Sequence, residues 1–163
     1  MKRINYYIKI ATRLLIIVIT CIGFANALLR YIGRYLHYNL SSNAFIELQW
    51  YLFSIVFLIG ASLVFQQNKH IRVDVFYTKF SKTKKKRFNL LGTLFLLIPF
   101  CSVLGYLSFL YFENSYAILE QSSEPNGLPR YLIKFFIPLA FVFLGANAIG
   151  YVINAIKNKK NAT

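Results

Sequence analysis

The chain has 163 residues, of which 57% are hydrophobic, and it carries a formal net charge of +14. Four long uncharged runs occupy most of this length, so a separate soluble domain does not fit. A strongly basic soluble protein would indicate nucleic-acid binding. Here the cations flank apolar runs, so anionic lipid headgroups are the expected counter-charge. We therefore predict a phospholipid membrane as the surroundings and no nucleic-acid partner.

The four runs predict membrane-spanning helices. A bilayer core about 30 Å thick needs ~20 apolar residues in a helix. Three runs reach that length unaided, and the first does so when its flanks join it, with Arg13 and Arg30 reaching toward the headgroups. The runs are Leu14–Leu29, Leu48–Asn68, Phe88–Phe112 and Phe135–Ile156. We predict an all-α polytopic membrane protein, a single membrane domain over residues 1–163. Its spans are expected at about 11–31, 45–66, 88–112 and 132–156.

The positive charge between the runs alternates from side to side. The five intervening segments hold 4, 2, 8, 2 and 3 Lys and Arg in chain order, so the odd-numbered segments hold 15 of the 19 cations. Cytoplasmic loops of membrane proteins carry excess Lys and Arg. The distribution predicts that both termini and the segment 69–87 are cytoplasmic, and that the other two loops face outward.

The first 13 residues form a basic leader. Ile4, Tyr7 and Ile8 are spaced for one helical face, which predicts that the leader lies on the inner leaflet before the first span. The leader and the Ala25–Ala27 motif also fit a cleaved signal peptide. We disfavour cleavage because the apolar run continues past that motif to Leu29 and then meets a charged flank.

The second span follows a Ser41–Asn43 cluster that offers a helix N-cap. Glu47 is expected in the first turn of this span, with Trp50 one turn later. A carboxylate at a helix N-terminus is favoured by the helix dipole, and for Glu47 alone we favour that interpretation. The alternative is a membrane-edge carboxylate paired with a cation on a neighbouring helix or subunit.

Segment 69–87 is the most basic part of the chain. Apolar residues from Val73 to Phe80 recur at i, i+3, i+4 and i+7, which predicts an amphipathic helix in the headgroup layer. Arg72 and Asp74 place a lone acid beside an arginine, which indicates a specific ion pair, although surface pairs contribute little by themselves.

The third span contains Pro99, which predicts a kink. The loop after it contains Pro125–Gly127, a strong turn sequence, and Pro129 restrains the chain before the last span. Two interpretations stand side by side. The segment from Glu124 to Arg130 is either a tight turn that positions a helix or a docking surface.

The sequence lacks the signatures of a catalytic or ion-conducting site. Neither His lies inside a run, so an axial haem pair is not available. Cys21 and Cys101 have no disulfide or metal-ligand spacing. No carboxylate lies at the middle of a run, and no Gly-rich phosphate loop is present. We expect a protein that is not an enzyme, holds no cofactor or metal, and packs as a scaffold against a larger membrane protein.

Four blocks, in order, resemble the small membrane (Q-type) subunit of tripartite ATP-independent periplasmic (TRAP) transporters. They are Glu47–Phe53 (ELQWYLF), Asn68–Asp74 (NKHIRVD), Ser123–Pro129 (SEPNGLP) and Lys134–Leu139 (KFFIPL). The resemblance covers essentially the whole chain. Asn126 departs from a pattern that often has Gly there, but Asn also accepts the left-handed conformation.

The resemblance implies a scaffold subunit with four spans that packs beside a large membrane transport subunit in a heterodimer. A periplasmic substrate-binding protein would deliver an organic acid, and a sodium gradient would drive its import across the bacterial inner membrane. The small subunit itself would bind no substrate. The residues expected to organise its fold and its subunit contacts are Glu47, Trp50, Arg72, Asp74, Glu124, Gly127, Pro129 and Arg130.

Two other classes remain open at this point. The chain could be the membrane anchor subunit of an oxidoreductase, with four helices around a quinone or haem, although the missing His pair argues against haem. It could also be a self-sufficient small channel or exporter, for which Asn26 and Asn147 are the polar candidates.

Overall fold

The computed structural model describes residues 2–38, 42–67 and 80–160, and most of these residues are helical. The helical segments are α1 (Lys2–Leu36), α2 (Asn43–Gln66), α4 (Lys82–Gly92), the π-helical segment η1 (Thr93–Leu97), α5 (Ile98–Ala117) and α6 (Arg130–Lys160). Segments α4, η1 and α5 follow one another without a break. Arg72, Asp74 and most of the predicted amphipathic helix lie outside the described residues.

Four helices in the described part of the chain are long and apolar enough to cross a membrane. These stretches are Tyr6–Leu36, Asn43–Gln66, Thr83–Ala117 and Arg130–Lys157. The predicted all-α fold with four spans is therefore confirmed.

The helices extend beyond the predicted spans. Helix α1 runs unbroken from Lys2 to Leu36, so the basic leader continues the first span as one helix. No Gly or Pro within residues 2–13 interrupts it. The lysine run that was expected in the 69–87 loop forms the first turns of α4, because Ser81 caps that helix by accepting from the Lys84 N–H at 3.4 Å. Long cationic stems can reach the headgroups from such a position.

The start of α2 confirms one prediction and corrects another. Ser42 is the N-cap, and its hydroxyl accepts from the Ala44 N–H at 3.3 Å, as the serine cluster indicated. The helix begins at Asn43, however, so Glu47 lies in the second turn rather than the first. The helix dipole acts mainly within the first turn, so it does not explain the position of this carboxylate.

Pro99 follows a local widening of the third span. Segment η1 is a π-helical turn, in which the Ile98 N–H donates to the Thr93 carbonyl five residues back. A proline ring clashes with the carbonyl four residues before it, and a widened turn relieves that crowding. Thr93 is buried, and its hydroxyl bonds back to the Asn89 carbonyl at 2.8 Å.

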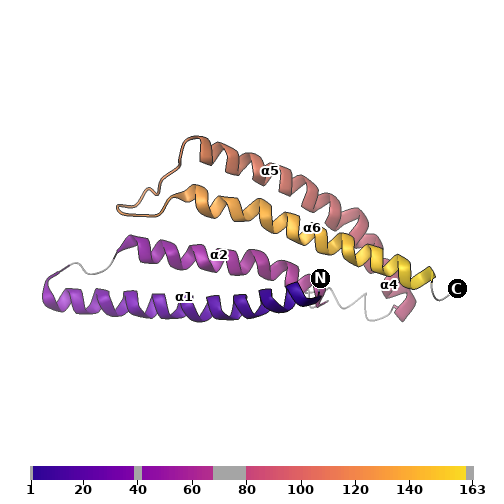
Figure 1. Cartoon of the computed structure of the whole chain (residues 1–163), viewed down its shortest axis with the longest axis horizontal. Helices are drawn as coiled ribbons and strands as arrows, with labels where there is room; N and C mark the ends of the chain where they lie inside the picture. The colour runs from indigo at the N-terminus through magenta and orange to yellow at the C-terminus, as the bar shows by residue number, and fades with distance from the viewer. Residues whose placement is uncertain (1, 39–41, 68–79, 161–163) are drawn as a thin grey trace.

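The four spans form a single layer rather than a closed bundle. Figure 1 shows them side by side in the order α1, α2, α6, α5, and the principal contacts are between neighbours in that order. The α2–α6 junction is fixed by a buried hydrogen bond, Asn147 Nδ2 to Ser62 Oγ at 2.7 Å. At the α1–α2 junction a Cβ on Gly23 would lie 2.7 Å from Gln49 Nε2, so Gly allows close approach there.

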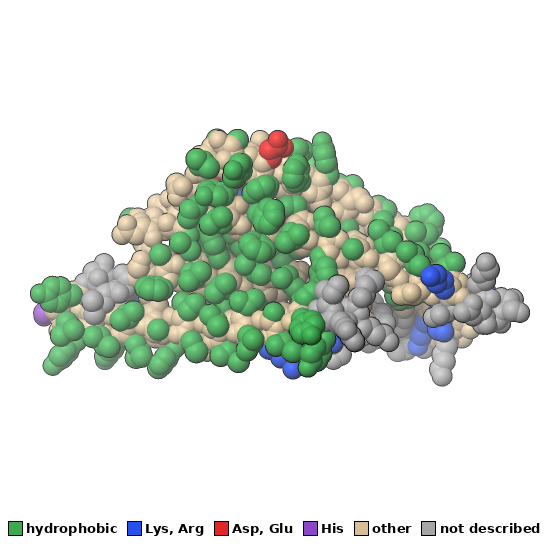
Figure 2. Space-filling view, viewed as in Figure 1, with side chains coloured by type: hydrophobic (Ala, Val, Ile, Leu, Met, Phe, Trp, Pro, Cys, Tyr) green, Lys and Arg blue, Asp and Glu red, His purple; other side chains and the backbone are tan. Residues whose placement is uncertain are grey.

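A single layer leaves both broad faces uncovered. Apolar side chains cover the visible face across α1, α2, α5 and α6 (Figure 2). The start of α1 and the end of α6 lie toward one end of the layer, opposite the end of α1, the start of α2 and the loop 118–129 (Figure 1). The Lys and Arg visible on this face gather toward the end with the start of α1 and the end of α6 (Figure 2). We call the opposite end the loop end.

Candidate functional site

The loop of residues 118–129, between α5 and α6, is held in a defined conformation by its own backbone. The Glu120 N–H donates to the Ser115 carbonyl at 3.0 Å, and the Arg130 N–H donates back to the Glu120 carbonyl at 2.9 Å. These bonds close the base of the loop at the points where α5 ends and α6 begins.

A tight turn forms the tip of the 118–129 loop. The Gly127 N–H donates to the Glu124 carbonyl at 3.1 Å, and Asn126 has φ 57°. With Pro125 at the second position and a positive φ at the third, this is the arrangement of a type II turn. Asn tolerates that left-handed conformation, as the sequence predicted.

Glu47 of α2 reaches under this turn and binds it. Its side chain is only 5% exposed, and its carboxylate accepts from the Ser122 hydroxyl and from the Leu128 backbone N–H. A Cβ at Gly127 would lie 2.4 Å from Ser122 Cβ and 2.8 Å from Glu47 Oε2. Position 127 therefore requires Gly, because a Cβ there would clash with Ser122 and with the Glu47 carboxylate. The positive φ of the turn is at Asn126, not at Gly127.

Two more side chains of α2 bind the same loop. Asn43 Nδ2 donates to the Pro125 carbonyl at 3.1 Å, and the Tyr51 hydroxyl donates to the Leu128 carbonyl at 3.2 Å. Together with Glu47 they are spaced four residues apart, so they share one face of α2. We call Asn43, Glu47 and Tyr51 the clamp face. It fixes the loop to α2 as well as to α5 and α6.

An ion pair lies where α5 meets α6. Lys134 Nζ contacts Glu120 Oε2, and the Ser115 hydroxyl donates to the same oxygen at 2.6 Å. The lysine also lies 4.0 Å from the centre of the Tyr111 ring. The hydrogen bonds from Lys134 and then from Ser115 lower the pKa of Glu120 below its usual value.

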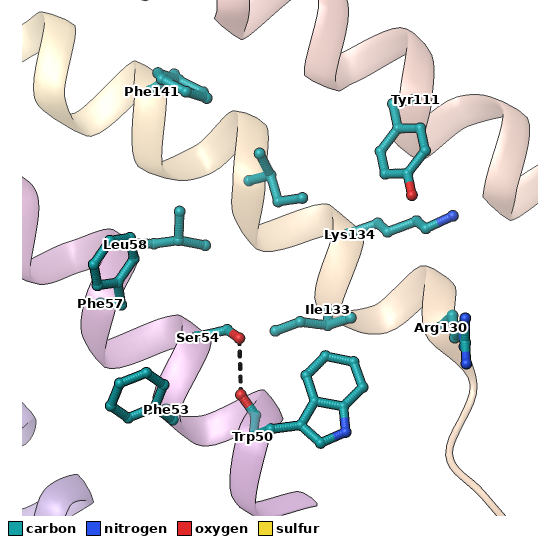
Figure 3. Close-up of a pocket in the computed structure, with 11 residues that line it drawn as sticks. Trp50, Phe53, Ser54, Phe57, Leu58, Tyr111, Arg130, Ile133, Lys134 and Phe141 are labelled. Carbon is teal, nitrogen blue, oxygen red and sulfur yellow. Dashed lines mark hydrogen bonds between the residues drawn. The ribbon is translucent and has the colours of Figure 1, made fainter. Parts of the chain in front are cut away.

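Arg130 and Trp50 lie beside a cleft between α2 and α6. Arg130 Nη2 donates to Ser123 Oγ at 3.0 Å, which ties the start of α6 back to the loop. Trp50 is 39% exposed and packs edge-on against Tyr51, with ring centroids 4.2 Å apart. Figure 3 shows Trp50, Ile133 and Arg130 at the end of the cleft nearest the loop.

The structure thus brings most of the candidate residues together at the loop end. Glu47 and Gly127 are in contact, Pro129 immediately precedes α6, and Arg130 starts that helix. The Glu124 side chain is exposed. Sequence reasoning missed the Glu120–Lys134 pair and the other two clamp-face residues, Asn43 and Tyr51. The four-residue spacing of Asn43, Glu47 and Tyr51 was the available signal.

Comparison with protein families gives one match. The model of the family described as "Tripartite ATP-independent periplasmic transporters, DctQ component" matches residues 19–158. The chain belongs to this family. The match contains both the clamp face and the 118–129 loop, and it confirms the resemblance to the small TRAP transporter subunit. A search of curated protein sequences finds no match. The DctQ family is a family of transporter components, so this chain is a small subunit of a TRAP transporter and a multi-pass membrane protein.

Proposed function

We propose that this chain is the scaffold subunit of a sodium-driven, binding-protein-dependent importer of an organic acid. It packs against the large membrane subunit of the same transporter in the bacterial inner membrane and braces it. The observation that carries this proposal is the single layer of spans. A row of helices presents one broad apolar face to a partner while the other faces lipid.

The layer is suited to bracing because its junctions are fixed. The buried Asn147–Ser62 bond joins α2 to α6. Aromatic rings join α5 to α6, where Phe100 and Phe141 pack edge-on at 6.2 Å. Without a hydrophobic driving force between helices in lipid, such bonds and close packing are what hold spans together. A partner that docks on this layer meets a rigid surface.

The second part of the proposal concerns the contacts made at the loop end. Glu47 and Trp50 organise the fold and the contact with the large subunit, and the Glu124–Arg130 segment contacts the docked binding protein. The support is the clamp face, which holds the loop in one conformation and so presents the turn as a preorganised surface. We also assign Arg72 and Asp74 to the contact with the large subunit, on the cytoplasmic side, from their sequence pattern.

The orientation follows from the charge distribution. We place both termini in the cytoplasm and the two loops in the periplasm. The cations visible near the termini in Figure 2 support this placement.

A transport assay tests the proposal. The complete complex is purified with its large subunit, reconstituted in proteoliposomes, and supplied with the binding protein and a panel of labelled organic acids. We expect uptake of a carboxylate under an inward sodium gradient and none when potassium replaces sodium. Vesicles with the large subunit alone serve as the matched control and should be inactive or unstable. Uptake that needs neither sodium nor this chain would refute the proposal.

A further inference from the structure

An open cleft runs between α2 and α6 on one face of the layer, with Tyr111 of α5 at its edge. Its volume is about 460 Å³. Most of its walls are apolar: α2 contributes Phe53 and Phe57, and α6 contributes Phe141 (Figure 3). Ile137 of α6 also lines it. This volume falls within the range of small-molecule sites, about 300–1,000 Å³.

The polar groups of the cleft lie at its loop end. Lys134 and Arg130 both line it there. The Lys134 charge is neutralised by Glu120. Arg130 uses Nη2 on Ser123, and a guanidinium carries five N–H donors in all. A guanidinium is also the side chain best suited to a phosphate group. The loop end of the cleft is therefore cationic and matched to an anion.

The length of the cleft corresponds to one leaflet. From Arg130 to Phe141 helix α6 advances eleven residues, or ~16 Å at 1.5 Å per residue. Half of a hydrocarbon core about 30 Å thick is about 15 Å. The charged end thus lies at the level of the headgroups when the apolar end lies near the middle of the bilayer.

The cleft is open along one side and apolar over most of its length, so a single hydrocarbon chain can lie in it. A lipid also carries a phosphate for the cationic end, so it matches both ends of the cleft, whereas an apolar helix of the large subunit would match only one.

We propose that the cleft binds one glycerophospholipid from the leaflet at the loop end. One acyl chain lies along Phe57, Ile137 and Phe141, and the phosphodiester receives hydrogen bonds from Arg130. Trp50 lies beside the headgroup, where aromatic side chains are favoured. The lipid fills the gap between α2 and α6, and so it joins these two neighbouring helices into one continuous surface. This inference requires only that the helices cross a membrane, and it stands whether or not the transport proposal holds.

Photo-crosslinking of the whole transporter complex tests the proposal. The complex is reconstituted in vesicles of phosphatidylethanolamine and phosphatidylglycerol that contain a trace of phosphatidylglycerol with a diazirine in one acyl chain. Mass spectrometry then locates the label. We expect it to be concentrated on the peptides around Phe57 and Ile137. A diacylglycerol probe with the same chain lacks the phosphate and should label them about tenfold less, the factor expected for a charge-assisted bond worth about 1.4 kcal/mol.

Three variants test whether the labelling depends on Arg130 and on the open space of the cleft. Arg130→Gln should reduce labelling of the cleft about tenfold, and Ile137→Trp should abolish it by filling the cleft while leaving the loop contacts untouched. Arg34→Gln, at the exposed end of α1 and away from the cleft, is the matched control and should change nothing. Uniform label over all lipid-facing helices would overturn the proposal. So would equal labelling by the two probes, or label that disappears when the large subunit is present.

Discussion

Replacing Glu47 with alanine should release the 118–129 loop from α2. The carboxylate accepts from the Ser122 hydroxyl and the Leu128 N–H, and it is almost fully buried. A hydrogen bond to a charged group contributes about 1.5–3 kcal/mol, so the loss of two costs about 3 kcal/mol at the lower limit. That free energy corresponds to an increase of roughly 100-fold in local opening of the loop.

Hydrogen exchange measures this opening directly, because the Leu128 amide is itself one of the two donors. In the purified complex we expect the peptide that contains Leu128 to exchange roughly 100-fold faster in Glu47→Ala. Glu47→Gln should be intermediate, since its amide oxygen can still accept one bond. Glu113→Ala, at an exposed carboxylate near the end of α5, is the matched control. Unchanged exchange in Glu47→Ala would refute the reasoning that this carboxylate holds the loop.

Three further changes test other contacts. Gly127→Ala should displace the turn and cost about 1–3 kcal/mol in the same exchange experiment, whereas Gly92→Ala, where a Cβ meets nothing within 4 Å, should be neutral or stabilising. Because the pKa of Glu120 is lowered from 4.5, its pairing with Lys134 should stabilise the loop fully above about pH 4.5. That stabilisation should fade as the pH falls through the folded pKa. Glu120→Gln should remove this effect from the protection factors, which are the exchange rates corrected for the intrinsic effect of pH on amide exchange. Asn147→Ala should weaken the α2–α6 junction by about 0.6–1.7 kcal/mol, seen as a lower thermal midpoint of the detergent-solubilised complex.

The spans could be predicted because the membrane imposes a simple rule. Every backbone group must be satisfied in lipid, so a long uncharged run can only be a helix. Local signals were also sufficient at Ser42, whose side chain caps α2, and at Asn126, whose residue type accepts a positive φ. Each of these features depends on neighbours within a few residues.

The contacts of Glu47 could not be predicted because its partners lie about 80 residues away. The sequence singled out Glu47 and the turn at Gly127 as separate features, and no local pattern joins them. The favoured explanation, a carboxylate stabilised by the helix dipole, also depended on where α2 begins. The structure starts that helix two residues earlier than the predicted span, which moves Glu47 into the second turn.

The lateral order of the spans also could not be predicted from the sequence. All four are apolar around most of their circumference, so their patterns do not say which faces meet protein and which meet lipid. The polar residues that decide it are few. Asn147 pairs with Ser62 across α2 and α6, and this bond is specified only once the helices are placed.

The central claim is that this chain is a scaffold for a larger membrane subunit. The most direct test is affinity purification of the tagged chain from its native membrane in mild detergent, with mass spectrometry of the proteins that accompany it. The account predicts a large polytopic transport subunit at equal stoichiometry. Recovery of an oxidoreductase subunit in its place, or of a stable homo-oligomer alone, would contradict it.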